Sequence, residues 1–206
     1  MGSLRLTPGR DAGRLFAVSM LGRWILDALA PIIAMIALVG AASIVLLAWR
    51  SRALAWRRAL SLTASDAMLL MALGGIGLLT LGQPLQAQPD RINLVPFRDQ
   101  IWAAQGLVDP ALAMAMLIGN VLLFVPLGMA LAFRWPGRGT WTLVLLAAGV
   151  SVAVEATQAL MNVGRLGDVT DVIANTAGAL LGVLPGRALR AGGMALIAVH
   201  RRDRTQ

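Results

Sequence analysis

The sequence contains no cysteine and a single histidine, and these two absences exclude several kinds of site. Without cysteine the chain has no disulfide, no thiolate nucleophile and no cysteine-ligated metal. The one histidine, His200, lies in an arginine-rich tail beyond the last apolar run. The body of the chain therefore lacks a histidine for general-base catalysis or metal ligation, and we expect neither a cofactor nor a bound metal.

Charge is also scarce. Only 14% of the 206 residues are charged, whereas a soluble domain carries about a quarter. Hydrophobic residues make up 58% of the chain, and its mean hydropathy is +0.74. Several apolar runs approach 20 residues, the length that crosses a hydrocarbon core of about 30 Å. We therefore predict an all-α, polytopic transmembrane helical bundle.

Lysine is absent, so arginine alone gives the chain its net charge of +8. Strong basicity can indicate nucleic-acid binding, but these arginines flank the apolar runs instead of clustering on one soluble face. That placement is typical of loops that stay in the cytoplasm and contact anionic lipid. We expect the lipid bilayer as the partner and no nucleic acid.

The apolar runs predict about five spans, joined by one long polar external loop at 83–110. Within that loop, residues 92–101 are apolar enough to pack against the membrane surface. The chain then divides into a basic N-terminal tail with one extra span (1–65), a four-span core (66–184) and a basic cytoplasmic tail (185–206). The spans cover residues 29–49, 66–81 (or an extension into 61–65), 111–133, 141–161 and 169–184, the last ended by Pro185 and Gly186.

Arginine asymmetry suggests an orientation of the spans in the membrane. With an external N-terminus, eleven arginines lie inside and seven outside. The bias is clear for the last four spans and weak for the first. If residues 15–30 and 31–49 formed two separate membrane segments, the N-terminus would lie inside. The side of the membrane on which the N-terminus lies therefore stays open.

Residues 151–182 carry polar groups inside apolar runs. Helical spacing places Glu155, Gln158 and Asn162 on one face of the fourth predicted span. Polar residues and glycines follow along one edge of the fifth, at spacings of 3, 4, 3 and 4: Asp168, Asp171, Asn175, Gly178 and Gly182. We predict that the two edges face each other across a turn whose Arg165 pairs with Asp168 and Asp171. Gly178 and Gly182 would let another helix approach closely.

A charge at the bilayer midplane costs about 3 kcal/mol on insertion scales. Glu155 must therefore be neutral, paired or facing a hydrated cavity. One interpretation is a structural network that holds two helices in register. The other is a polar cleft open to the external side, and its candidate ligand-binding residues are Asn93, Asn120, Glu155, Gln158, Arg165, Asp168, Asp171 and Asn175.

Four blocks of the sequence resemble the VanZ-like family of bacterial membrane proteins. They are NLVPF (93–97), GNVLLFVPLG (119–128), the Glu155-x-x-Gln158 pair and RLGDVTDVIANTAGALLG (165–182). The resemblance covers about residues 66–184 and implies a place in the cell envelope. The name-giving member is associated with low-level resistance to the glycopeptide teicoplanin. The positions that the resemblance singles out are Asn93, Pro96, Phe97, Asn120, Phe124, Pro126, Gly128, Glu155, Gln158, Arg165, Asp168, Asp171, Asn175, Gly178 and Gly182.

Two functions fit these residues. The first is a non-enzymatic envelope protein whose external cleft binds a polar lipid or a cell-wall precursor, with a link to antibiotic resistance implied by the resemblance. The alternative is an intramembrane hydrolase or transferase, with Glu155 as general base and with Asp168 and Asp171 polarising a water or holding a divalent cation. The chain has no nucleophile elbow, no HExxH and no phosphate-binding glycine loop, which favours the first. The identity of the ligand and the oligomeric state stay open.

Overall fold

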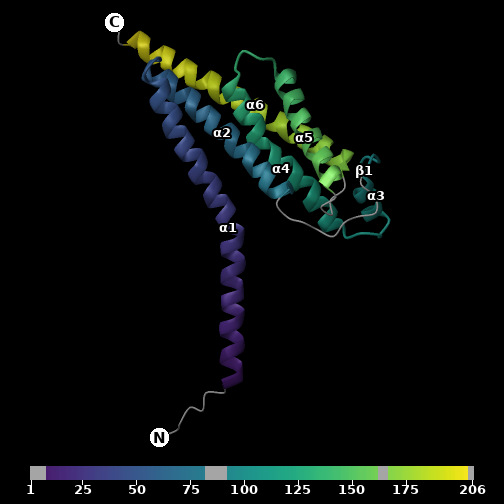
Figure 1. Ribbon diagram of the computed structural model, residues 1–206. Helices are drawn as coiled ribbons and strands as arrows, with labels where there is room; N and C mark the ends of the chain where they lie inside the picture. The colour runs from purple at the N-terminus through teal and green to yellow at the C-terminus, as the bar shows by residue number, and fades with distance from the viewer. Residues whose placement is uncertain (1–7, 82–91, 162–166, 204–206) are drawn as a thin grey trace.

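The computed structural model describes residues 8–81, 92–161 and 167–203 (Figure 1). In these residues the chain forms six helices and two strands of two residues each, which confirms the predicted all-α class. The elements are α1 (Pro8–Arg50), α2 (Trp56–Leu81), β1 (Ile92–Asn93), α3 (Arg98–Ala104), α4 (Pro110–Arg134), α5 (Thr140–Met161), β2 (Gly167–Asp168) and α6 (Val169–Asp203).

Five of the described helices are long and apolar enough to cross a membrane, so the predicted number of spans is confirmed. The second begins well before residue 66, in line with the extension left open above. The five segments are Leu29–Arg50, Trp56–Thr80, Pro110–Arg134, Thr140–Met161 and Val169–Gly192.

The predicted end of the last span at Pro185 and Gly186 is wrong, because α6 continues through both residues to Asp203. Proline is tolerated within transmembrane helices because neighbouring groups satisfy the backbone that it frees. Gly186 serves a packing role: a Cβ built there would lie 3.0 Å from Ala132 Cβ. Arg187 and Arg190 then donate to the carbonyl oxygens of Arg138 and Phe133, which holds α6 along the end of α4.

The pair α4 and α6 forms the centre of the bundle. A Cβ added at Gly178 or Gly182 of α6 would collide with the carbonyl oxygens of Val121 and Val125 on α4. The predicted close approach at these two glycines is confirmed, and α4 is the helix that approaches. Gly128 of α4 meets the backbone of α6 in the same way. Around this contact the largest fully buried apolar side chains are Phe124, Ile76, Leu127, Leu143 and Val183.

The other spans pack around that pair: α5 on α6, α2 on α4, and α1 on α2. Contact between α1 and the rest is limited, since only 6% of the most apolar stretch of its span is buried. Ile33, Leu38 and Ile44 are largely exposed and face the lipid phase. The N-terminal half of α1 extends away from the bundle (Figure 1).

One end of the bundle is held by an ion cluster centred on Asp66 of α2. Asp66 Oδ2 lies 2.6 Å from Nη2 of Arg50, at the end of α1, and Oδ1 accepts from Nε of Arg134, at the end of α4. Arg50 also donates to the Thr63 hydroxyl at 3.3 Å. One carboxylate therefore joins three helices, a pairing that was not predicted from the sequence.

Asp66→Ala is expected to lower the free energy of unfolding by about 1–3 kcal/mol, between the values for exposed and buried ion pairs. The two guanidinium groups would then face each other without a shared anion. Unfolding in detergent, followed by circular dichroism during titration with dodecyl sulfate, measures this change. The control is Asp99→Ala, which removes an exposed contact of 3.6 Å to Arg98; an equal loss in both variants would contradict the expectation.

Candidate functional site

At the opposite end, two segments far apart in sequence lie side by side. β1 pairs in parallel with β2, so that Ile92 faces Gly167 and Asn93 faces Asp168. Gly167 also lets β2 lie against α5, because a Cβ there would lie 2.9 Å from the carbonyl oxygen of Glu155. The pairing places the NLVPF block against the first turn of α6.

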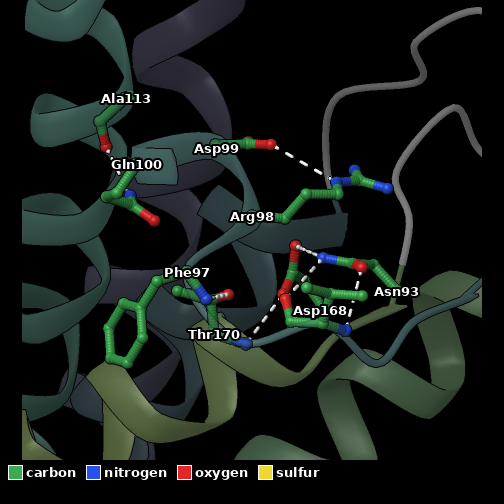
Figure 2. Close-up of polar contacts among 9 residues, drawn as sticks. Asn93, Phe97, Arg98, Asp99, Gln100, Ala113, Asp168 and Thr170 are labelled. Atoms are coloured by element: carbon green, nitrogen blue, oxygen red, sulfur yellow. Dashed lines mark hydrogen bonds and ion pairs between the residues drawn. The ribbon is translucent and has the colours of Figure 1, made fainter. Parts of the chain in front are cut away.

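Asp168 joins three parts of the chain (Figure 2). Its Oδ1 accepts from the Thr170 N–H at 2.7 Å, an N-cap interaction that satisfies a free donor of the first turn of α6. Its Oδ2 accepts from Asn93 Nδ2 at 2.8 Å. Its own backbone N–H donates to Glu155 Oε2 at 2.9 Å. The positive end of the α6 dipole favours the carboxylate at this position.

The NLVPF block is fixed at both of its ends. The buried side chain of Asn93 exchanges hydrogen bonds with the backbone of Val95, at 3.1 Å and 3.3 Å. At the other end, the Phe97 N–H donates to the Thr170 hydroxyl at 2.9 Å. Phe97 has a φ of 56°, the only positive φ of a residue other than glycine within the described part of the chain. The sequence did not point to Thr170, whose hydroxyl stabilises this bulky residue in the left-handed region.

Further along α5, two polar contacts are buried between helices. Asn175 Nδ2 donates to the Ser151 hydroxyl at 2.9 Å, and Gln158 Nε2 donates to the Thr80 carbonyl at 3.0 Å. The prediction of two facing edges is thus confirmed for Glu155 and Asn175 and wrong for Gln158, which faces α2. Ser151 was missed, although its position four residues before Glu155 puts it on the same helical face.

The amide oxygens of Gln158 and Asn175 have no hydrogen-bond donor among the described residues, although both side chains are 2% exposed. A buried oxygen of this kind is normally satisfied by protein or by an ordered water. In the part of the chain that the structure describes, these two oxygens can accept from an ordered water.

Two hollows flank the first turns of α6. One, of about 250 Å³, lies between α2, α4 and α6, and its polar lining residues are Thr80, Asn120 and Asp171. The other, of about 270 Å³, lies between β1, α5 and α6 and is called the groove below. Its polar lining residues are Glu155 and Asp168, and the rest of its wall is apolar or glycine: Ile92, Leu94, Val152, Ala156, Ala159, Gly167, Val169 and Val172.

The structure thus brings together most of the residues that the sequence singled out. Asn93, Glu155 and Asp168 are linked by hydrogen bonds beside the groove, while Asn120 and Asp171 share the other hollow. Asn175 lies deeper, against Ser151. Arg165 and Asn162 fall outside the described residues, so the predicted pairing of Arg165 with Asp168 and Asp171 stays a prediction.

A family model described as VanZ/LLP1 matches residues 67–190. The chain belongs to the VanZ/LLP1 family. No curated protein and no solved structure matches it. The match runs from α2 into α6 and includes every described site residue, whereas α1 lies outside it. The VanZ part of the protein is therefore the four-span bundle of α2, α4, α5 and α6.

Within this VanZ protein the blocks that carried the resemblance divide into two roles. Phe124, Gly128, Gly178 and Gly182 pack α4 against α6. Of the described polar members, Asn93, Glu155 and Asp168 hold the NLVPF block, and Asn120 and Asp171 line a hollow. Gln158 and Asn175 instead bond to α2 and α5. The packing residues thus set the position of α6, and its N-terminal end positions the polar groups.

The enzymatic alternative is not favoured by these contacts. Glu155 and Asp168 both accept backbone N–H groups, and Asp168 also caps a helix. Among the described residues no three Asp, Glu or His side chains gather closely enough to hold a metal ion. In this arrangement the carboxylates organise the site through hydrogen bonds within the protein.

Proposed function

We propose that this VanZ protein is a non-enzymatic cell-envelope protein of the bacterial cytoplasmic membrane that binds a polar lipid or a lipid-linked cell-wall precursor. The observation that carries the proposal is the groove, because its wall is almost wholly apolar and the hydrogen-bonded carboxylates of Glu155 and Asp168 lie beside it. An apolar cavity next to polar groups suits a molecule with an apolar chain and a polar head.

The head group has to provide most of the selectivity. An apolar chain that leaves the bilayer for the groove exchanges one apolar environment for another, so the hydrophobic effect contributes little. The described polar groups next to the groove are mainly acceptors, which favours hydroxyl, amide or ammonium donors on the ligand. In this proposal Arg165 meets a phosphate or amide group of the same ligand, since guanidinium suits both.

Lipid analysis of the purified protein tests the proposal. The protein would be extracted with its surrounding lipid in polymer nanodiscs, and its lipids would be compared with the bulk membrane by mass spectrometry. We expect one lipid class to be enriched in wild type and lost in Ala156→Trp, which fills the groove from an exposed position on α5. Leu145→Trp is the matched control, because Leu145 lies on the same helix, faces lipid and does not line the groove.

Glu155→Gln tests the polar groups beside the groove separately. Loss of the negative charge of this side chain is expected to reduce the enrichment of the bound lipid class about tenfold, which corresponds to about 1.4 kcal/mol. Circular dichroism and gel filtration would confirm that the variant is folded. Bulk lipid composition in wild type and all variants alike would overturn the proposal.

The proposal extends to tolerance of glycopeptides or other envelope-active antibiotics, for which the support is the family resemblance alone. Growth of a deletion strain against a panel of such antibiotics, complemented by wild type or Ala156→Trp, tests this extension. We expect wild type to restore growth and Ala156→Trp to fail.

A further inference from the structure

Residues 92–107, which include β1 and α3, expose a group of large apolar side chains. We call these residues the interfacial segment. Leu94, Leu107 and Val95 are 76%, 68% and 54% exposed. Ile101 is 46% exposed and Trp102 39%. Exposed large apolar side chains gathered on one short segment indicate a site of protein or membrane contact.

The structure fixes the direction in which this surface points. Gln100 Nε2 donates to the Ala113 carbonyl at 3.1 Å, which attaches α3 to the first turn of α4. Arg98, Ile101 and Trp102 follow the spacing i, i+3, i+4 and therefore share one face of α3. Figure 2 shows Gln100 directed towards Ala113 and Arg98 directed away from it.

The apolar surface is continuous with surfaces that face lipid. α4 begins three residues after Leu107, and Leu112 and Met116 in its first turns are more than half exposed. On the other side, Ile92 and Leu94 share the wall of the groove with Val152 and Val172 of the membrane-spanning helices α5 and α6. A bilayer that covers these spans therefore reaches the interfacial segment without a gap.

Arg98 and Trp102 suit the same position, and Asp99 lies 3.6 Å from Arg98 Nε on the same helix. The Arg98 guanidinium lies 4.7 Å from the centroid of the Trp102 ring. Tryptophan is enriched at the level of the lipid head groups, where its ring is amphipathic. An arginine stacked on it has its positive charge at the depth of the lipid phosphates.

We propose that the interfacial segment inserts into the head-group region of the bilayer leaflet at this end of the bundle. Leu94, Ile101 and Leu107 reach about 5–10 Å into the acyl boundary, as in amphipathic interfacial helices. Arg98 meets the lipid phosphates. Because Ile92 and Leu94 are part of the groove wall, the groove opens sideways to this leaflet. The insertion does not depend on any ligand in the groove.

The natural absence of cysteine makes the test direct, since each single-cysteine variant carries one label. Leu94→Cys, Ile101→Cys and Leu107→Cys would be labelled with the fluorophore NBD and reconstituted into vesicles of phosphatidylethanolamine and phosphatidylglycerol. Quenching would be compared between aqueous iodide and lipids that carry a doxyl group at carbon 5 or carbon 12. Gln105→Cys, at an exposed polar position, and Ile118→Cys, on the exposed side of α4, are the controls.

We expect the three apolar positions to be quenched at least twofold more by the shallow doxyl lipid than by iodide or the deep one. Gln105 should respond to iodide and Ile118 to the deep lipid. Quenching of the three positions by iodide, as at Gln105, would place the segment in water and overturn the proposal. Protection from all three quenchers would also overturn it, because protein, such as a second copy of the chain, would then cover the surface. Each position is an independent test, so one variant that fails to fold leaves two.

Discussion

Gly182→Ala is expected to lower the free energy of unfolding by about 3 kcal/mol or more, the upper range for overpacking. The added Cβ would collide with the Val125 carbonyl and lie 2.9 Å from the Met129 nitrogen. These obstacles are backbone atoms of a transmembrane helix, which cannot rotate away as a flexible side chain does. α4 and α6 would have to separate along their whole contact, and the polar groups at the start of α6 would move with them.

Gly149→Ala and Gly192→Ala are matched controls for this prediction. A Cβ at either position meets no atom within 4 Å, and alanine favours a helix over glycine by about 1 kcal/mol. These two variants should be as stable as wild type or slightly more stable. Titration with dodecyl sulfate, monitored by far-ultraviolet circular dichroism, measures all three. If Gly182→Ala behaved like Gly149→Ala, the close contact of α4 and α6 would be incorrect.

Asp168→Ala is expected to have the second large effect, a loss of about 2–3 kcal/mol together with release of the NLVPF block from α6. The helix cap contributes about 1 kcal/mol of this, and the charge-assisted bond from Asn93 contributes the remainder. Hydrogen–deuterium exchange should rise at residues 92–97 and in the first turn of α6. Because Ile92 and Leu94 form part of the wall of the groove, lipid enrichment should fall as well.

Asp109→Ala separates capping from the contact between segments. Asp109 caps α4 by accepting from the Ala111 N–H at 2.8 Å, and it is exposed. Its loss should cost about 1 kcal/mol and leave exchange at residues 92–97 unchanged. Asp168→Asn should give an intermediate loss of stability, since asparagine also caps helices but lacks the negative charge. If Asp168→Ala lowered the free energy of unfolding no more than Asp109→Ala, the hydrogen bond from Asn93 would not contribute to stability.

The spans and the glycine contact could be predicted from the sequence because both depend on local properties. Length and hydropathy define a span, and spacings of three and four residues define a helical face. Gly178 and Gly182 therefore indicated a close contact, although α4 as the partner came only from the structure. Pro185 was misleading because the rule that proline ends a helix is weaker within a membrane bundle.

The contacts that could not be predicted from the sequence depend on how the helices lie against one another. Helical spacing put Gln158 on the same face as Glu155, but its partner is a backbone carbonyl of α2, and every residue has a carbonyl. Asp66 looked like the first residue of a span, yet its two arginines are 16 and 68 residues away. Thr170 has an ordinary helical position, and only the contact with Phe97 gives its hydroxyl a role.

The pairing of Asn93 with Asp168 has a consequence for how the protein is made. The two residues are 75 positions apart, and Phe97 and Thr170 are 73 apart. At 5–20 residues per second, the ribosome needs about 4–15 s to add the second partner after the first. During that interval the NLVPF block lacks its partners on β2 and α6, and α4, once made, lacks the helix against which Gly128 packs. The site therefore forms only after the last span has been synthesised, so a chain interrupted before α6 would reach the membrane with both features unpaired.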